Sequence, residues 1–201
     1  MIKNFTQIRV AVLADAEAIA NVHVTSWQEA YAGILPDQML SDLNVADRTK
    51  RWTSVISRKA GGRESSVFLA LNKGRAVGFV SVGPQRDIAL HDKGFTGEIE
   101  ALYVLAAAQR NGIGRDLIRQ AAQHLLASEQ KAAALWVLED NHPARTFYEA
   151  MGARVVGFRE DVRTDATLNE VAYGWEDLSK DLVHPRRVAC QLNVAFSTLE
   201  V

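Results

Sequence analysis

Two glycines and two arginines mark the expected start of a helix in residues 106–122, "AAAQRNGIGRDLIRQAA". The first backbone N–H groups of a helix have no partner inside the helix, and the helix dipole favours negative charge there. Gly112 and Gly114 let the backbone come close to a ligand, and Arg110 and Arg115 add positive charge. The spacing predicts an anion site, for which phosphate is the natural ligand.

Two common nucleotide motifs do not account for this turn. No Lys and Ser/Thr pair follows the second glycine, as a P-loop requires, and Leu117 stands where a dinucleotide fingerprint has its third glycine. A structural alternative remains open, in which Gly112 and Gly114 only let the helix begin close to a sheet.

Hydrophobic periodicity predicts the elements that position this turn. Their expected order is β, α, α, β, β, β, α, β, α, β, β, which favours an α+β fold with a mixed, mostly antiparallel twisted sheet and helices on both faces. The expected elements are a strand at "TQIRVAV", a helix capped by Asp15, a helical stretch from Asp37 with a break near Asn44, a hairpin over 67–82, a loop over 83–97, a strand over 98–104, the helix after the glycine turn, a strand at "AALWVL", a helix at "PARTFYEAMG", and strands at "ARVVGF" and "EVAYGW".

Two stretches resemble the signatures of the Gcn5-related N-acetyltransferase (GNAT) family. "VLAAAQRNGIGRDLI" is similar to the family's QxxGxG motif, and "NHPARTFYEAMGA" is similar to its second motif. The matching residues are Gln109, Gly112, Gly114, Asn141, Ala144, Tyr148 and Gly152.

The resemblance covers residues 7–175, so we expect one acetyltransferase domain over residues 1–178 and a C-terminal extension over residues 179–201. Departures from the family pattern occur at Leu105, Ala106 and Ala153, where they affect loop details.

The family's cofactor is acetyl-CoA, and the resemblance implies how it binds. Backbone amides from Arg110 to Arg115 would hold the pyrophosphate, and the pantetheine arm would lie along Leu102 to Val104, where the strand would separate from its neighbour with a β-bulge. Asn141 would cap a helix and bond the cofactor or substrate. The cofactor-binding residues are thus Leu102, Tyr103, Val104, Gln109, Arg110, Asn111, Gly112, Ile113, Gly114, Arg115 and Asn141.

Direct transfer of the acetyl group to a primary amine needs a base and an acid, because the acceptor arrives protonated and a thiolate departs. Glu98 is the first candidate for the base and Glu100 the second; either is alternatively a solvated strand carboxylate. Tyr148 is similar to the family's general acid, and is alternatively a packed aromatic.

The acceptor itself is not specified beyond a small-molecule or peptide amine. His23, Trp27 and Tyr31 are candidates for lining its pocket, with core packing as the alternative for Trp27. A different function class is a catalytically inactive CoA-binding sensor or interaction module that keeps the cofactor site.

Composition and charge narrow the remaining classes of function. The net charge of −1 provides no field for general nucleic-acid binding, no apolar run is long enough for a membrane span, and the N-terminus does not resemble a signal peptide, so a cytoplasmic protein is expected. The single cysteine, Cys190, and the spacing of the histidines predict neither a disulfide nor a metal site. Alternating apolar residues over 188–196 predict a strand that covers a sheet edge or pairs in a homodimer, unless this tail is disordered.

Overall fold

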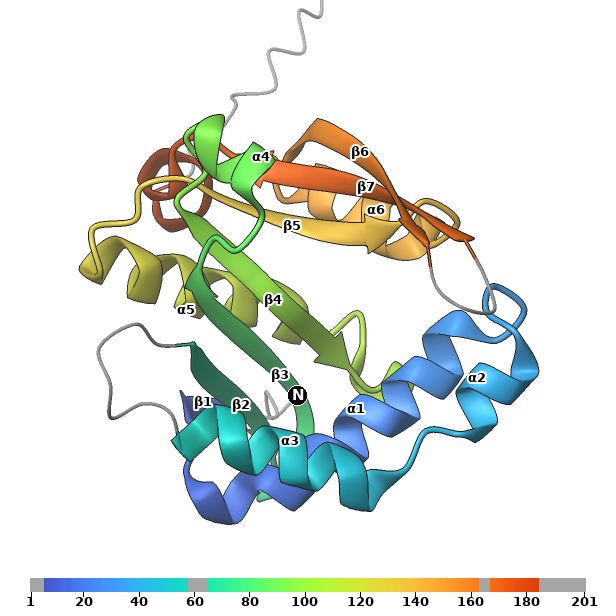
Figure 1. The fold of residues 1–201 in the computed structure, drawn as a ribbon. Coiled ribbons are helices and arrows are strands. Elements are labelled where there is room, and N and C mark those ends of the chain that lie inside the picture. The colour runs from blue at the N-terminus through green and yellow to red at the C-terminus, as the bar shows by residue number, and fades with distance from the viewer. Residues whose placement is uncertain (1–5, 58–64, 163–166, 185–201) are drawn as a thin grey trace, which may run out of the picture.

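The computed structural model describes residues 6–57, 65–162 and 167–184. Its strands form one seven-stranded sheet in the order β1-β2-β3-β4-β5-β7-β6 (Figure 1). The strands are β1 (Thr6–Val10), β2 (Ser66–Asn72), β3 (Arg75–Pro84), β4 (Gly97–Val104), β5 (Ala133–Leu138), β6 (Arg154–Val162) and β7 (Thr167–Trp175). The helices are α1 (Ala16–Tyr31), α2 (Asp37–Ser41), α3 (Val45–Ser57), α4 (Ile88–Asp92), α5 (Ile113–Ala127) and α6 (His142–Ala150), with short helical turns η1 (Leu13–Asp15), η3 (Ala106–Ala108) and η4 (Ser179–Val183).

The predicted α+β class is confirmed, since every pair of neighbouring strands is antiparallel except β4 with β5. The break predicted near Asn44 is present, because α2 ends at Ser41 and α3 begins at Val45. The predicted loop before β4 was wrong in part, as it contains α4. This helix is capped by Asp87, whose side chain accepts a hydrogen bond from the Leu90 amide at 3.2 Å.

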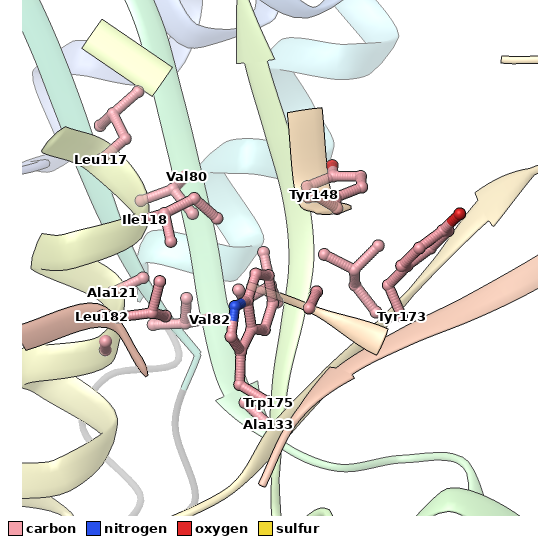
Figure 2. Close-up of a cluster of buried hydrophobic side chains, with 14 of the residues drawn as sticks. Val80, Val82, Leu117, Ile118, Ala121, Ala133, Tyr148, Tyr173, Trp175 and Leu182 are labelled. Carbon is pink, nitrogen blue, oxygen red and sulfur yellow. The ribbon is translucent and has the colours of Figure 1, made fainter. Parts of the chain in front are cut away.

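Helices cover both faces of the sheet (Figure 1). On one face, α1 and α3 pack against β2 and β3 around Phe79. On the other face, α5 and α6 bury a larger cluster against the centre of the sheet (Figure 2). The stripe that α5 turns to the sheet repeats at helical spacing and consists of Ile113, Leu117, Ile118, Ala121, Ala122 and Leu125.

The two parallel strands β4 and β5 separate after a short contact. They pair only at Gly97 with Ala133 and at Glu98 with Ala134, and Figure 1 shows them diverging from there. The register between β3 and β4 shifts so that Glu100 is the extra residue of a β-bulge. The predicted separation and bulge are therefore present, with the bulge nearer the start of β4 than the stretch from residue 102 to 104.

The chain after β7 returns to the core. Leu178 and Leu182 are buried, and η4 packs against α5. The first residues of the expected extension thus contact the domain. The strand predicted over 188–196, with Cys190, lies outside the described residues.

Asp15 precedes α1 at its N-cap position, but its side chain does not cap the helix as the sequence predicts. Its side chain makes no cap hydrogen bond to α1. It accepts hydrogen bonds from both terminal nitrogens of Arg9 at 2.6 and 2.8 Å and from the Val12 amide at 2.8 Å. The nearby guanidinium offers a charged, two-point partner, which outcompetes the neutral helix amides.

We expect Asp15→Ala to lower the free energy of unfolding by about 1–2 kcal/mol, because charged hydrogen bonds are lost and solvent already screens part of the pair. Hydrogen bonding to Arg9 lowers the pKa of Asp15, so this contribution is present above the ordinary carboxyl pKa and disappears as pH falls through the lowered one. Denaturant unfolding across pH measures it, with the exposed Asp92→Ala as control. Equal effects of the two substitutions would contradict the prediction.

Candidate functional site

The turn before α5 has the backbone of an anion site. Gly112 adopts a left-handed conformation with φ of 83°, and Arg110 does so with φ of 59°. The first helical hydrogen bond runs from the Asp116 amide to the Gly112 carbonyl at 3.0 Å. Within the described part of the chain, no hydrogen bond uses the amides from Arg110 to Arg115, which leaves them available to a ligand.

The two glycines differ in what they do. A Cβ on Gly112 would lie 2.9 Å from a terminal nitrogen of Arg115, in addition to the strain of its positive φ. A Cβ on Gly114 would lie 3.3 Å from the Phe147 ring of α6. Gly112 therefore shapes the turn, while Gly114 lets α5 and α6 pack closely; the structural alternative named a sheet as the neighbour, and the close contact of Gly114 is with a helix.

Other residues of the motif hold the turn in place. The side chain of Gln109 donates to the Val104 carbonyl at 2.9 Å and ties the turn to the end of β4. The side chain of Asn111 donates to the Gln109 carbonyl at 3.0 Å. Arg115 pairs with Asp116 at 3.2 Å and is half exposed, so it can also reach a phosphate above the turn.

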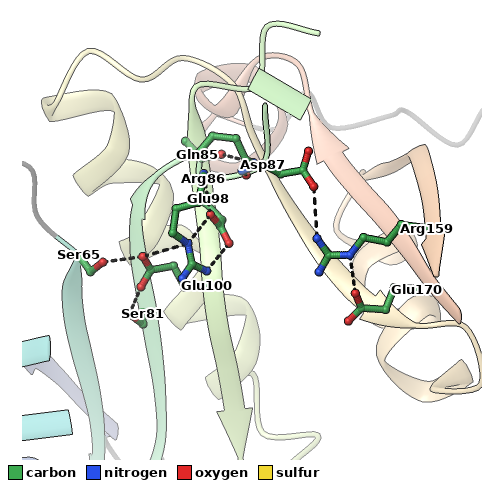
Figure 3. A network of polar contacts seen from close by, with 10 residues as sticks. Ser65, Ser81, Gln85, Arg86, Asp87, Glu98, Glu100, Arg159 and Glu170 are labelled. Atoms are coloured by element: carbon green, nitrogen blue, oxygen red, sulfur yellow. Dashed lines mark hydrogen bonds and ion pairs between the residues drawn. The ribbon is translucent and has the colours of Figure 1, made fainter. Parts of the chain in front are cut away.

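Glu98 lies at the closed end of the β4 and β5 pair, in a tight ion pair. Arg86, which follows β3, donates its backbone amide at 3.0 Å, Nε at 2.9 Å and Nη2 at 2.6 Å to this carboxylate (Figure 3). A carboxylate has about four lone-pair sites, and these hydrogen bonds occupy three of them. The carboxylate of Glu98 therefore has little capacity left to accept a proton from a substrate.

Glu100 lies on the same side of β4, two residues nearer the separated end. One carboxylate oxygen accepts from Ser65 Oγ at 2.5 Å and the other from Ser81 Oγ at 2.7 Å (Figure 3). Arg86 Nε is 3.9 Å away. Counting the described residues alone, each oxygen of Glu100 keeps a lone pair, and Arg86 is the one charged partner, at a distance.

Aromatic side chains from α1, β4 and α6 meet where β4 has left β5. Trp27 Nε1 donates to the Tyr103 hydroxyl at 2.7 Å. Burial raises the pKa of Tyr31, while polar contacts with Tyr103 and Asn141 oppose that rise. Burial and the nearby Tyr31 raise the pKa of Tyr148 well above its usual value, so its hydroxyl stays protonated at neutral pH. Three predicted site residues from distant parts of the chain, Tyr103, Asn141 and Tyr148, thus lie around Tyr31, together with Trp27 of the same helix.

Asn141, which lies near Tyr31, caps helix α6 as the sequence predicts. Its side chain accepts from the Ala144 amide at 3.2 Å and caps α6. That cap fixes the start of the helix that carries Tyr148. Tyr148 is only 7% exposed and packs near Trp175, so the packing alternative also describes its ring (Figure 2).

His23 lies beneath this group. Its ring stacks on Tyr103 at 5.0 Å, and its Nδ1 accepts from Trp52 Nε1 at 3.1 Å. Burial, with the positive charges of Arg48 and Arg51, lowers the pKa of His23 to about 3. The imidazole is therefore neutral at physiological pH, and its accepting nitrogen is already occupied.

Sequence reasoning missed Arg86 and Arg48. Nothing in the spacing connects Arg86 with Glu98, since the pair depends on how the loop after β3 folds over β4. Arg48 carries a recognisable signal, because it precedes the apolar Trp52 by one helical turn and so places a cation on an apolar helix face.

Two classes of site find no support in the part of the chain that was searched. Among the described residues, no group of three or more His, Cys, Asp or Glu side chains is placed to hold a metal ion. None of the helices found there is long and apolar enough to span a membrane.

Comparisons with known proteins give a consistent result. The model of the acetyltransferase (GNAT) family matches residues 24–153. The uncharacterized N-acetyltransferase YuaI of Bacillus subtilis (strain 168) is 37% identical over 173 residues, which are 86% of this chain and 94% of that protein.

Solved structures share the fold. The crystal structure of PaiA N-acetyltransferase from Thermoplasma acidophilum in complex with coenzyme A has a TM-score of 0.66 at 19% identity, and covers 83% of this chain and 98% of that one. The structure of YncA from Salmonella typhimurium with its cofactor acetyl-CoA has a TM-score of 0.64 at 20% identity, and covers 86% and 94%.

Proposed function

The chain belongs to the GNAT acetyltransferase family, and from that membership we propose that it transfers the acetyl group of acetyl-CoA directly to a primary amine of a small molecule or peptide. One observation carries the proposal. The free amides from Arg110 to Arg115 lie at the end of a strand that has separated from its neighbour, so an anion site and an open strand edge are contiguous.

The residues of this region suit acetyl-CoA. Amides at the start of α5 would bind its pyrophosphate, with Arg110 and Arg115 supplying charge. The edge of β4 that faces β5 has no strand partner from Ile99 onward, so its backbone groups can pair with pantetheine amides. When bound, acetyl-CoA supplies the reactive thioester. The family resemblance assigned these positions, and the free backbone groups support that assignment.

For the base, we propose Glu100 ahead of Glu98, which reverses the order expected from the sequence. Glu100 lies nearer the separated end of β4 and retains acceptor capacity on both oxygens, whereas Arg86 occupies most of that of Glu98. Glu100 would take the proton of the acceptor amine directly or through water. Glu98 and Arg86 would hold the loop after β3 against β4.

For the acid, we propose Tyr148. Its hydroxyl is protonated at neutral pH and would give that proton to the departing sulfur as negative charge develops there. Trp27 and Tyr31, which lie on α1 beside the separated end of β4, would contact the acceptor, and His23 would support them from below.

Thiol release from acetyl-CoA with a panel of amines tests the function. Release that depends on an amine, with the acetylated amine as product, is the expected result. Acetyl-CoA binding without release for any amine of the panel would instead favour the inactive sensor or interaction module. Absence of acetyl-CoA binding would contradict both functions.

Glu100→Gln is expected to lower kcat/KM at neutral pH about 100-fold, because general-base catalysis contributes on that scale. Glu98→Gln is expected to lower stability instead and to retain most of the activity. Steady-state kinetics, with denaturant unfolding of each variant, separates the two. A loss of activity in folded Glu98→Gln alone would return the base to Glu98.

A further inference from the structure

Arg48 occupies a position on α3 where an apolar residue is expected. The face that α3 turns to α1 and the sheet carries Val45, Trp52, Val55 and Ile56. Arg48 lies one helical turn before the buried Trp52 and is itself half-buried. A cation at such a place loses part of its hydration, so its charge needs a partner.

The described residues provide no such partner. Among them, no ion pair or hydrogen bond joins the Arg48 guanidinium to any side chain or carbonyl, and its Cζ lies 5.8 Å from the centre of the Trp27 ring. Its charged neighbours are Arg51, one turn away on the same helix, and Asp47, the preceding residue, whose carboxylate pairs with Lys50 at 3.1 Å. Burial and Arg51 lower the pKa of Arg48 more than Tyr103 and Asp47 raise it. The free protein thus keeps two repelling cations together beside an aromatic ring, an arrangement that an anion would stabilise.

The position of Arg48 indicates whether that anion would belong to the acceptor or to acetyl-CoA. The Trp27 ring under Arg48 donates a hydrogen bond to Tyr103 on β4, beside the separated end of the strand. This is the face covered by α1 and α3, whereas the free amides proposed for the pyrophosphate belong to α5, which covers the opposite face. Arg48 therefore lies on the acceptor side.

We propose that the acceptor amine carries an anionic group, a carboxylate or a phosphate, and that Arg48 binds this group and selects for it. The inference rests on the proposed acetyltransferase function. A guanidinium binds either group through two parallel N–H···O bonds, and its planar face stacks on Trp27 at the same time. Arg51, which is exposed, adds positive charge around the same point.

Matched acceptor pairs test the proposal. One arm compares dipeptides that have a free C-terminal carboxylate with the same dipeptides carrying a C-terminal amide; the other compares ethanolamine phosphate with ethanolamine. In at least one arm the anionic member is expected to have a kcat/KM about 10- to 100-fold higher, through KM, because a charged hydrogen-bonded pair forms. The arm that responds identifies carboxylate or phosphate.

Arg48→Gln is expected to abolish the preference, by raising KM for the anionic member about 10- to 100-fold, and to leave the affinity for acetyl-CoA unchanged. Arg48→Lys should show part of the preference for the anionic acceptor, since the charge is kept without the two-point geometry. Lys50→Gln is the matched control, because it removes one positive charge from the same helix at an exposed position paired with Asp47. It should retain the full preference.

Calorimetric titration of each acceptor into the protein holding coenzyme A repeats the comparison without turnover. Equal binding of both members of every pair, or a preference that survives in Arg48→Gln, would overturn the inference while leaving the acetyltransferase function intact. Weaker acetyl-CoA binding in Arg48→Gln would assign Arg48 to the cofactor and overturn it as well. Failure of thiol release with every amine would count against the proposed function, and the titration would still decide whether Arg48 binds an anion.

Discussion

Tyr148→Phe is expected to lower kcat about 10²- to 10⁴-fold and to leave the affinity for acetyl-CoA nearly unchanged. The substitution removes only the hydroxyl, while the ring keeps its packing beside Phe147 and Trp175. Since the hydroxyl is proposed to protonate the departing sulfur, its loss affects the transition state rather than the binding of substrates. Steady-state kinetics with the best acceptor and calorimetry with acetyl-CoA measure the two effects.

Tyr173→Phe is a suitable control for this prediction. Tyr173 is also buried, and its hydroxyl contacts Arg145 and Glu149 rather than the group around Tyr31. Its loss should affect stability and spare kcat. Because burial raises the pKa of Tyr148, its ionisation does not produce a limb near neutral pH, and the profile of Tyr148→Phe should keep the shape of the wild-type profile. Full activity in Tyr148→Phe would leave Tyr148 with packing alone.

Gly112→Glu is expected to raise the dissociation constant of acetyl-CoA by at least about 100-fold, because several charge-assisted hydrogen bonds to backbone amides are lost. The new residue would adopt a positive φ, its Cβ would displace Arg115, and its carboxylate would repel a phosphate. Calorimetric titration of the folded variant with acetyl-CoA gives the measurement.

The backbone strain of that substitution needs its own control. Gly94 has a similar φ of 94°, and no atom lies within 4 Å of the place its Cβ would take. Gly94→Glu therefore introduces the same strain and charge before β4, away from the turn, and should leave acetyl-CoA binding unchanged. Comparable weakening in both variants, or unchanged binding in Gly112→Glu, would show that the pyrophosphate binds elsewhere.

Local signals in the sequence were enough to predict most elements. The apolar stripe of α5, the hairpin turn at Gly74 with its φ of 76°, and the division between α2 and α3 each depend on residues close together in the chain. The backbone of the glycine turn could also be predicted from local sequence, because unpaired amides at a helix start follow from helix geometry itself. Its ligand stays a prediction.

Two local predictions were wrong in part where a tertiary contact or a short element competed. Asp15 occupies the N-cap position of α1 as predicted, but its side chain binds the guanidinium of Arg9 on β1 in place of the helix amides. The five residues of α4 are too few to show helical periodicity, and that helix is held by burying Leu90 against β5 and β7. A pattern in one segment cannot include the charge or surface that another segment brings to it.

The chemistry of the candidate site also depends partly on local sequence and partly on contacts between distant segments. The sequence made Glu98 and Glu100 the two candidates for the base, but only the folded chain decides that Arg86 occupies one carboxylate and two serines the other. The meeting of Trp27, Tyr103 and Arg48 likewise requires α1, α3 and β4 to pack together. Residue types and local periodicity determine which groups are present and which way they face along an element. Packing between distant segments determines which of those groups are neutralised, and which keep a lone pair or a charge for a ligand.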